Sequence, residues 1–97
     1  MNDNILVFKI TDQSDFSKLN PSKNIKHFIA DLTDLKSEMQ TLLIENFTKF
    51  EKNVYSNEGS FVIVSNINFD DNLNIVPSLQ EAYDFIDMEE IERQLKF

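Results

Sequence analysis

The sequence predicts a small α/β domain in which helices pack on a four-stranded, mostly parallel sheet. Short apolar segments rich in strand-forming residues alternate with longer segments whose apolar residues recur at helical spacing. The candidate strands are almost entirely apolar, as is typical of strands buried on both faces of a parallel sheet. A chain of 97 residues is long enough for one core, so residues 1–97 are treated as a single domain.

Four segments are the candidate strands. They are residues 5–10 (ILVFKI), 27–32 (HFIADL), 60–65 (SFVIVS) and a shorter group made of Leu73, Ile75 and Val76, which ends at Pro77. The region between the first two strands, residues 11–23, is polar and contains the turn signal Asn20-Pro21. We expect at most one helical turn there, at residues 15–19.

The first long helix is expected to begin between residues 34 and 37. Ser37-Glu-Met-Gln40 fits a capping box, in which Ser accepts a hydrogen bond from a backbone N–H and Gln reaches back. One apolar stripe follows at three- and four-residue spacing: Met39, Leu42, Leu43, Phe47 and Phe50. Gly59, the only glycine, ends the connection to the next strand.

A second long helix is expected to begin at Ser78-Leu-Gln-Glu81, which also fits a capping box. Its apolar stripe continues nearly to the C-terminus as Leu79, Ala82, Phe85 or Ile86, Met88, Ile91 and Leu95. We interpret this stripe as core, although Ile91, Leu95 and Phe97 would also suit a docking patch. The acidic residues Glu89, Glu90 and Glu92 are expected to form the solvated face, with Glu89–Arg93 as an i,i+4 pair. The functional interpretation of that face is an acidic docking surface for a basic partner.

Composition excludes several classes of protein. The formal net charge of −8 would repel a phosphate backbone, so nucleic-acid binding is not expected. The absence of cysteine excludes disulfides, thiolate catalysis and thiolate metal ligation. The N-terminal residues form no signal peptide and the apolar runs are too short for a membrane span, so we expect a soluble cytoplasmic protein.

Few residues suit catalysis or cofactor binding. His27 is the only histidine, so neither a His-rich metal site nor a catalytic triad is expected, and we interpret it as a surface or strand-end residue. One glycine cannot build a glycine-rich phosphate loop. Asp70 and Asp71 are interpreted as a solvated turn rather than a cation site. We therefore expect no enzyme activity, no metal and no cofactor.

Three segments together resemble a known family. IADLTDL before a helix, then SFVIVS, then NIVPSLQEAYDFI are similar to the STAS domain, the fold of bacterial anti-sigma-factor antagonists. Asp31-Leu-Thr33 matches the motif that ends a buried strand in that family, and Ser78-Leu-Gln-Glu-Ala82 matches the start of its C-terminal helix. The resemblance covers residues 4–88. It implies a non-catalytic regulatory domain, a monomer or weak dimer, that acts through protein–protein contact.

The resemblance also implies where a partner docks, namely the strand exit and the start of the following helix. Those positions are Thr33, Asp34, Ser37, Gln40 and Thr41. Gln40 stands where the family has its phosphorylatable serine, and Leu42 replaces the glycine that turns beneath the phosphate. The expected docking surface is therefore permanently uncharged at that position. Ser37, at the helix start, is interpreted as a cap rather than as a phosphorylation site.

A second resemblance leads to an alternative. The C-terminal VPSLQEA and MEEIER sequences are similar to short chains associated with ribonuclease Z. That metallo-hydrolase family needs several histidines, and this chain has only His27. The resemblance therefore implies an accessory partner of a separately encoded enzyme, not a nuclease.

Overall fold

Four parallel strands form one sheet whose spatial order follows the chain, β1-β2-β3-β4. The computed structural model describes residues 4–11 and 24–95. The strands are β1 (Ile5–Lys9), β2 (His27–Asp31), β3 (Phe61–Val64) and β4 (Ile75–Val76). The helices are α1 (Ser37–Leu42), α2 (Ile44–Ser56) and α3 (Leu79–Leu95). The predicted four-stranded α/β fold is confirmed, and the sheet is parallel throughout. The turn and single helical turn expected within residues 12–23 lie outside the described residues.

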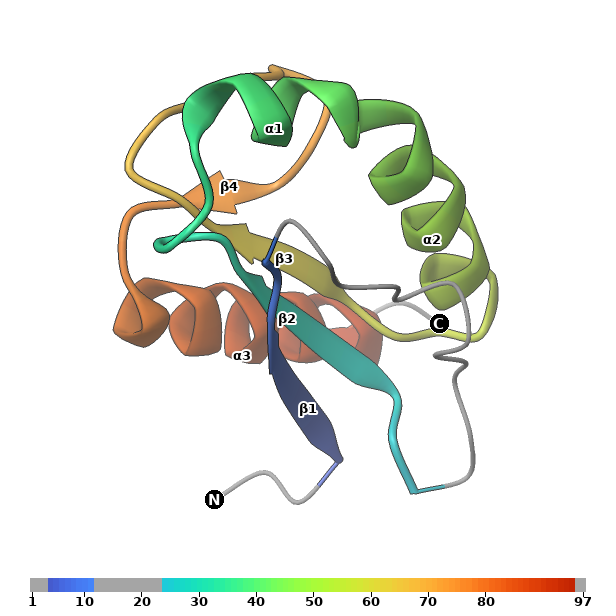
Figure 1. The fold of residues 1–97 in the computed structure, drawn as a ribbon. Coiled ribbons are helices and arrows are strands. Elements are labelled where there is room, and N and C mark those ends of the chain that lie inside the picture. The colour runs from blue at the N-terminus through green and yellow to red at the C-terminus, as the bar shows by residue number, and fades with distance from the viewer. Residues whose placement is uncertain (1–3, 12–23, 96–97) are drawn as a thin grey trace.

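The two central strands alternate their side chains between two cores, so the molecule has three layers. Phe28 and Ala30 of β2 and Phe61 and Ile63 of β3 face α2, whereas Ile29, Val62 and Val64 face α3. Figure 1 shows α1 and α2 on one side of the sheet and α3 on the other. Both faces are covered, which explains the continuous apolar sequence of β2 and β3. The edge strand β1 is only partly buried, with Val7 38% exposed, because it has one neighbouring strand among those described.

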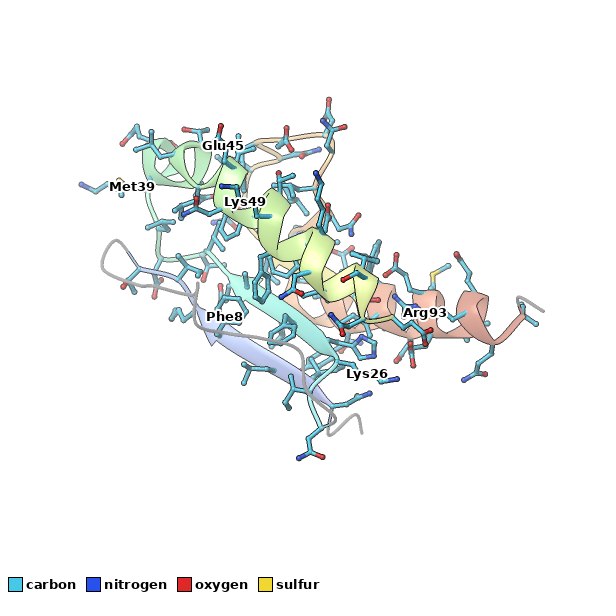
Figure 2. All side chains as sticks on the ribbon, turned by 90° about the vertical axis from the view of Figure 1, so that its right-hand side faces the viewer. Phe8, Lys26, Met39, Glu45, Lys49 and Arg93 are labelled. Carbon is cyan, nitrogen blue, oxygen red and sulfur yellow. The ribbon has the colours of Figure 1, made fainter. Side chains whose placement is uncertain are left out.

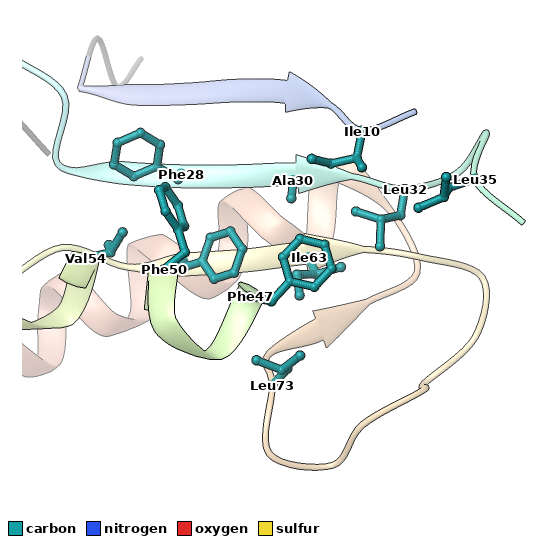
Figure 3. Packing of buried hydrophobic residues seen from close by; sticks show 11 residues of the cluster. Ile10, Phe28, Ala30, Leu32, Leu35, Phe47, Phe50, Val54, Ile63 and Leu73 are labelled. Carbon is teal, nitrogen blue, oxygen red and sulfur yellow. The ribbon is translucent and has the colours of Figure 1, made fainter. Parts of the chain in front are cut away.

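Phenylalanine dominates the core under α2. Phe28, Phe50 and Phe61 pack edge to face, with ring centroids 5.0 Å apart in both pairs that include Phe50 (Figure 3). Phe8 of β1 joins them from the sheet side at 6.2 Å from Phe50 (Figure 2). These contacts hold α2 on the sheet through its buried face, Phe47, Phe50 and Val54.

The single helix predicted from residue 37 onward is two helices, so that prediction is wrong in detail. Leu43 separates them with φ −97° and ψ 2°, and its N–H bonds to the carbonyl of Gln40. The break lets α1 lie beyond the carboxyl ends of β2 and β3 while α2 lies along the sheet (Figure 1). Leu42, expected in the buried stripe, is 73% exposed as a result.

The turn after α2 uses two residues in different ways. The N–H of Glu58 bonds to Tyr55 O and that of Gly59 to Val54 O, which is the Schellman arrangement. Glu58, with φ 63°, takes the left-handed position that usually holds glycine. Gly59 is needed for another reason, since a Cβ there would lie 1.8 Å from the carbonyl oxygen of Lys26.

A loop without a helix connects β3 to β4. Phe69 packs against the α2-side core, 6.4 Å from Phe47, and Leu73 is buried in that core. Asp70 and Asp71 lie in this loop, Asp70 half-buried and Asp71 exposed. The predicted solvated turn therefore describes Asp71 better than Asp70.

The helix α3 begins as the sequence predicts. The Oγ of Ser78 accepts a hydrogen bond from the N–H of Glu81 at 3.2 Å, as in a capping box. Only Ala82 and Ile86 of α3 are buried, and they pack on Ile29, Val62 and Val64. The prediction that the whole stripe is core is wrong, because Leu79, Met88, Ile91 and Leu95 are 42%, 63%, 56% and 67% exposed.

Candidate functional site

The strand exit after β2 is organised by Asp31. Its carboxylate accepts hydrogen bonds from the N–H and the Oγ1 of Thr33, at 3.0 and 2.7 Å. Asp34 is exposed and forms an ion pair of 2.6 Å with Lys9, at the end of β1. The hydrogen bond and charge of Asp34 raise the pKa of Lys9. The local geometry is thus a short loop joined to the neighbouring strand by exposed polar contacts.

Four of the five predicted docking residues lie on the surface here. Thr33, Asp34, Ser37 and Thr41 are exposed, and Thr41 Oγ1 donates to Glu38 O. Ser37 is the first residue of α1 rather than its cap, because Lys36 holds the cap position without a side-chain hydrogen bond. The predicted capping box at Ser37 is therefore wrong.

Gln40 does not belong to that surface, contrary to the prediction. It is 5% exposed, and its Nε2 donates to Leu35 O at 2.8 Å and to Leu32 O at 3.4 Å. Its Oε1 accepts a hydrogen bond from the Oγ of Ser65, at the end of β3. Both the donor and the acceptor of the amide form hydrogen bonds within the fold, so Gln40 holds α1 against the carboxyl ends of β2 and β3.

Beside this loop is a depression of about 270 Å³. Thr11, Asp34, Leu35, Lys36 and Met39 line it. Its described lining brings together the hydroxyl of Thr11, the carboxylate of Asp34 and the ammonium group of Lys36.

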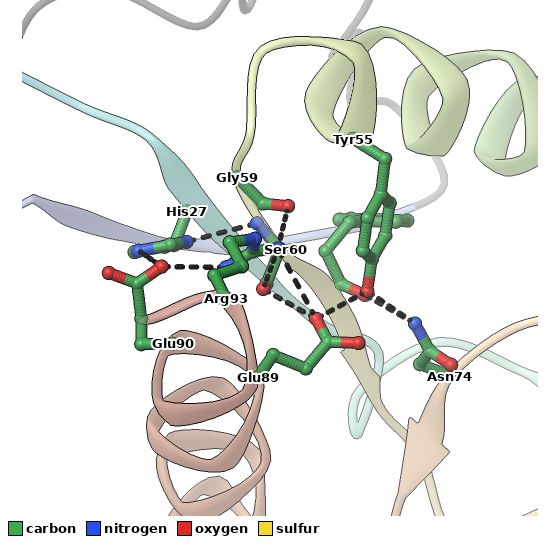
Figure 4. A network of polar contacts seen from close by, with 9 residues as sticks. His27, Tyr55, Gly59, Ser60, Asn74, Glu89, Glu90 and Arg93 are labelled. Carbon is green, nitrogen blue, oxygen red and sulfur yellow. Dashed lines mark hydrogen bonds and ion pairs between the residues drawn. The ribbon is translucent and has the colours of Figure 1, made fainter. Parts of the chain in front are cut away.

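A polar network lies at the opposite end of the sheet, where α2 and α3 meet the start of β3 (Figure 4). The carboxylate of Glu89 accepts hydrogen bonds from Tyr55 Oη at 2.8 Å and from the Oγ of Ser60. Asn74 Nδ2 donates to Tyr55 Oη at 2.8 Å. Burial and the bond to Glu89 raise the pKa of Tyr55 far above its usual value, so it is a hydrogen-bond donor and not a phenolate.

Arg93 completes the network from the next turn of α3. It donates to Gly59 O, to Ser60 Oγ at 2.9 Å and to Glu90 Oε1 at 2.6 Å, and it lies 3.7 Å from Glu89. The predicted Glu89–Arg93 pair is confirmed. Glu89 is only a quarter exposed, however, so the prediction that it belongs to the solvated face is wrong.

His27 is buried at the start of β2, so the strand-end prediction is confirmed and the surface alternative is not. Its Nδ1 accepts a hydrogen bond of 2.9 Å from the N–H of Ser60, so the neutral ring carries its proton on Nε2. Among the described residues Nε2 has no hydrogen-bond partner, and Glu90 Oε1 lies 3.7 Å away. Burial lowers the pKa of His27, which keeps the ring neutral.

The network joins α2, the start of β3 and α3 through hydrogen bonds. Its hydroxyl, carboxylate and guanidinium groups satisfy one another and the carbonyl of Gly59. Within residues 4–11 and 24–95, no three His, Cys, Asp or Glu side chains gather so as to hold a metal ion. The sequence did not indicate this cluster, because its residues come from three separate parts of the chain and belong to no motif: Tyr55 with Ser60, Asn74, and Arg93.

The outward face of α3 is the remaining feature. Met88, Ile91 and Leu95 lie at three- and four-residue spacing, hence on one face of the helix, and all are more than half exposed. Glu89 and Arg93, on the opposite face, hold this half of the helix through the polar network. The chain thus presents an apolar stripe on a fixed helix.

Comparison with models of protein families, with curated proteins and with solved structures found no significant match to this chain. Within the described part of the chain, no helix is both long and apolar enough to cross a membrane.

Proposed function

We propose that this chain is a non-catalytic protein–protein interaction domain, of the regulatory type that the STAS resemblance implies. The observation that carries the proposal is the exposed apolar stripe Met88, Ile91 and Leu95 on the outer face of α3. Large side chains gathered on one exposed face, opposite a face already anchored, are typical of an interaction surface. We name these three residues the outer stripe.

The anchoring of α3 supports this proposal. A helix fixed by Tyr55, Ser60 and the carbonyl of Gly59 loses little conformational freedom when a partner binds. The polar groups of the network keep α3 in place, because they form hydrogen bonds with one another within the fold. The exposed residues Thr33, Asp34, Ser37 and Thr41 are the second candidate surface, and they lie in a different part of the chain.

Affinity capture from the native cell with two variants tests the proposal. Met88→Gln/Ile91→Gln should abolish capture of a stoichiometric partner, whereas Leu42→Gln, which alters another exposed apolar residue, on α1, should leave capture unchanged. Circular dichroism confirms that each variant is folded. Loss of capture by Thr33→Ala/Asp34→Ala instead would move the interface to the strand exit. The proposal fails if no partner is retained, or if none of these variants alters its retention.

The same capture separates a regulator from the alternative, an accessory of a separately encoded enzyme such as ribonuclease Z. An accessory should remain with one enzyme through purification and alter its stability or activity. A regulator should exchange between partners and dissociate on dilution.

A further inference from the structure

We propose that the partner of the outer stripe is a basic amphipathic helix, with apolar residues at helical spacing flanked by Lys or Arg. This inference rests on the proposed function and adds the chemistry of the partner. Three features carry it: the spacing of the stripe, the acidic residues around it, and the inward position of the one cation on α3.

The spacing suits a helix as the occupant. Met88, Ile91 and Leu95 form a ridge in which neighbours are three and four residues apart, and ridges of this kind pack into the groove of a second helix. An amphipathic helix binds such a surface through its own apolar residues, which have the same spacing. Met88 adds an unbranched side chain that adapts to an uneven partner.

The rim of the stripe is acidic. Asp84 lies four residues before Met88, Asp87 four before Ile91, and Glu92 three before Leu95, so each borders the stripe on the helix surface. All three are exposed. Arg93, the only basic residue within the bounds of α3, points away from this rim and bonds to Gly59, Ser60 and Glu90 (Figure 4). The described rim of the apolar strip is therefore acidic.

The same charges disfavour the other occupants. A second copy of this chain would bring one acidic rim against another, and like charges across an interface oppose association. The net charge of −8 likewise opposes an anionic membrane surface or a nucleic acid. A helix with Lys or Arg beside its apolar residues buries the stripe and pairs with the rim, and opposite charge also speeds the encounter.

Titration of the protein with three fluorescent peptides of about 18 residues, enough for five helical turns, tests the inference. The first has a leucine stripe flanked by Lys and Arg, the second has the same stripe flanked by Glu, and the third scrambles the first. We expect the first peptide to bind at least about tenfold more tightly than either of the others, since only it matches both stripe and rim.

Matched variants locate the binding. Ile91→Gln should weaken the first peptide at least about fivefold, and Leu42→Gln should not. Glu92→Gln should weaken it less and reduce its dependence on salt, whereas Glu45→Gln, an exposed glutamate on α2, should change neither.

Each contrary result overturns the inference. Equal binding of the scrambled peptide would show charge attraction without a helix, and equal binding of the acidic peptide would show apolar contact without charge recognition. A dimer in sedimentation analysis that Ile91→Gln dissociates would make the occupant a second copy. If the cellular partner depends on Ile91 while no peptide binds, the interaction function stands and the proposed partner chemistry fails.

Discussion

Replacing Gln40 with Glu should destabilise the fold, although the two side chains have nearly the same shape. The amide Nε2 donates to the carbonyls of Leu35 and Leu32, while Oε1 accepts from Ser65. A carboxylate keeps the acceptor and loses the donor, and it places an ionised oxygen beside carbonyl oxygens in a site that is 5% exposed. The substitution therefore removes one end of the tie and adds a repulsive charge.

The structure sets the size of this effect. Leaving the buried Leu35 carbonyl without its Gln40 donor costs about 1–3 kcal/mol, and burying the carboxylate adds to that cost. The Leu32 carbonyl still accepts from the N–H of Leu35, so it adds less. We expect the free energy of unfolding at pH 7 to fall by about 2–4 kcal/mol, with part of the loss recovered at lower pH when the new carboxyl takes up a proton.

Urea denaturation followed by circular dichroism measures the change, and Gln94→Glu, at an exposed position of α3, is the matched control. The control should alter stability by no more than about 0.5 kcal/mol. Equal stability of the two variants would refute the reasoning, because it would mean that Gln40 is solvated as the sequence suggested.

Three further predictions concern the turns and the network. Glu58→Gly should raise the free energy of unfolding by about 0.5–1 kcal/mol, visible as a higher melting temperature, because glycine relieves the left-handed backbone; an equal gain from Glu58→Ala would contradict this cause. Gly59→Ala should lower it by about 3 kcal/mol through the clash with Lys26 O, and a neutral result in denaturation would show that the strand start has room to move. The pKa of His27 is lowered, chiefly by burial, and the charged groups around it are Glu90, Arg93, Lys26 and Glu89. The stability linked to the neutral imidazole should therefore be complete above about pH 6.5, its pKa in the unfolded state. This stability should be lost as pH falls from there toward the folded-state pKa. His27→Asn should flatten the dependence of unfolding free energy on pH in that range, and an unaltered slope would assign it to other groups.

The strands were predictable from sequence because burial on both faces of a parallel sheet leaves its mark on every residue. Phe28 to Ala30 and Phe61 to Val64 have no polar member, and no other local structure of that length fits as well. The start of α3 was equally predictable, since the residues of a capping box lie within four consecutive positions.

The break at Leu43 and the burial of Gln40 were not predictable in the same way. Helical spacing continues across Leu43, so periodicity alone does not separate α1 from α2. The partners of Gln40 are two backbone carbonyls and Ser65, and nothing in the local sequence marks those groups as near. Long-range hydrogen bonds to backbone carbonyls produce no sequence pattern from which they could be predicted.

The outer stripe shows a different limit of sequence reasoning. Ala82 and Ile91 were assigned to one stripe by residue type, yet one is buried and the other exposed. They are nine residues apart, which at 3.6 residues per turn places them on opposite faces of α3. The sheet-facing side changes from apolar to polar between Ile86 and Glu89.

Under the proposed function, Gln40 and α3 determine where the interaction can be regulated. The position that the STAS resemblance assigns to a phosphorylatable serine is occupied by a buried amide whose donor and acceptor are both engaged. A kinase needs an exposed hydroxyl, and any charge at this place would break the tie between α1 and the strands. An interaction at the strand exit therefore cannot be switched through residue 40. In the proposed interaction the outer stripe needs no modification, because its apolar residues and acidic rim are permanent, and its affinity should follow ionic strength and partner concentration instead.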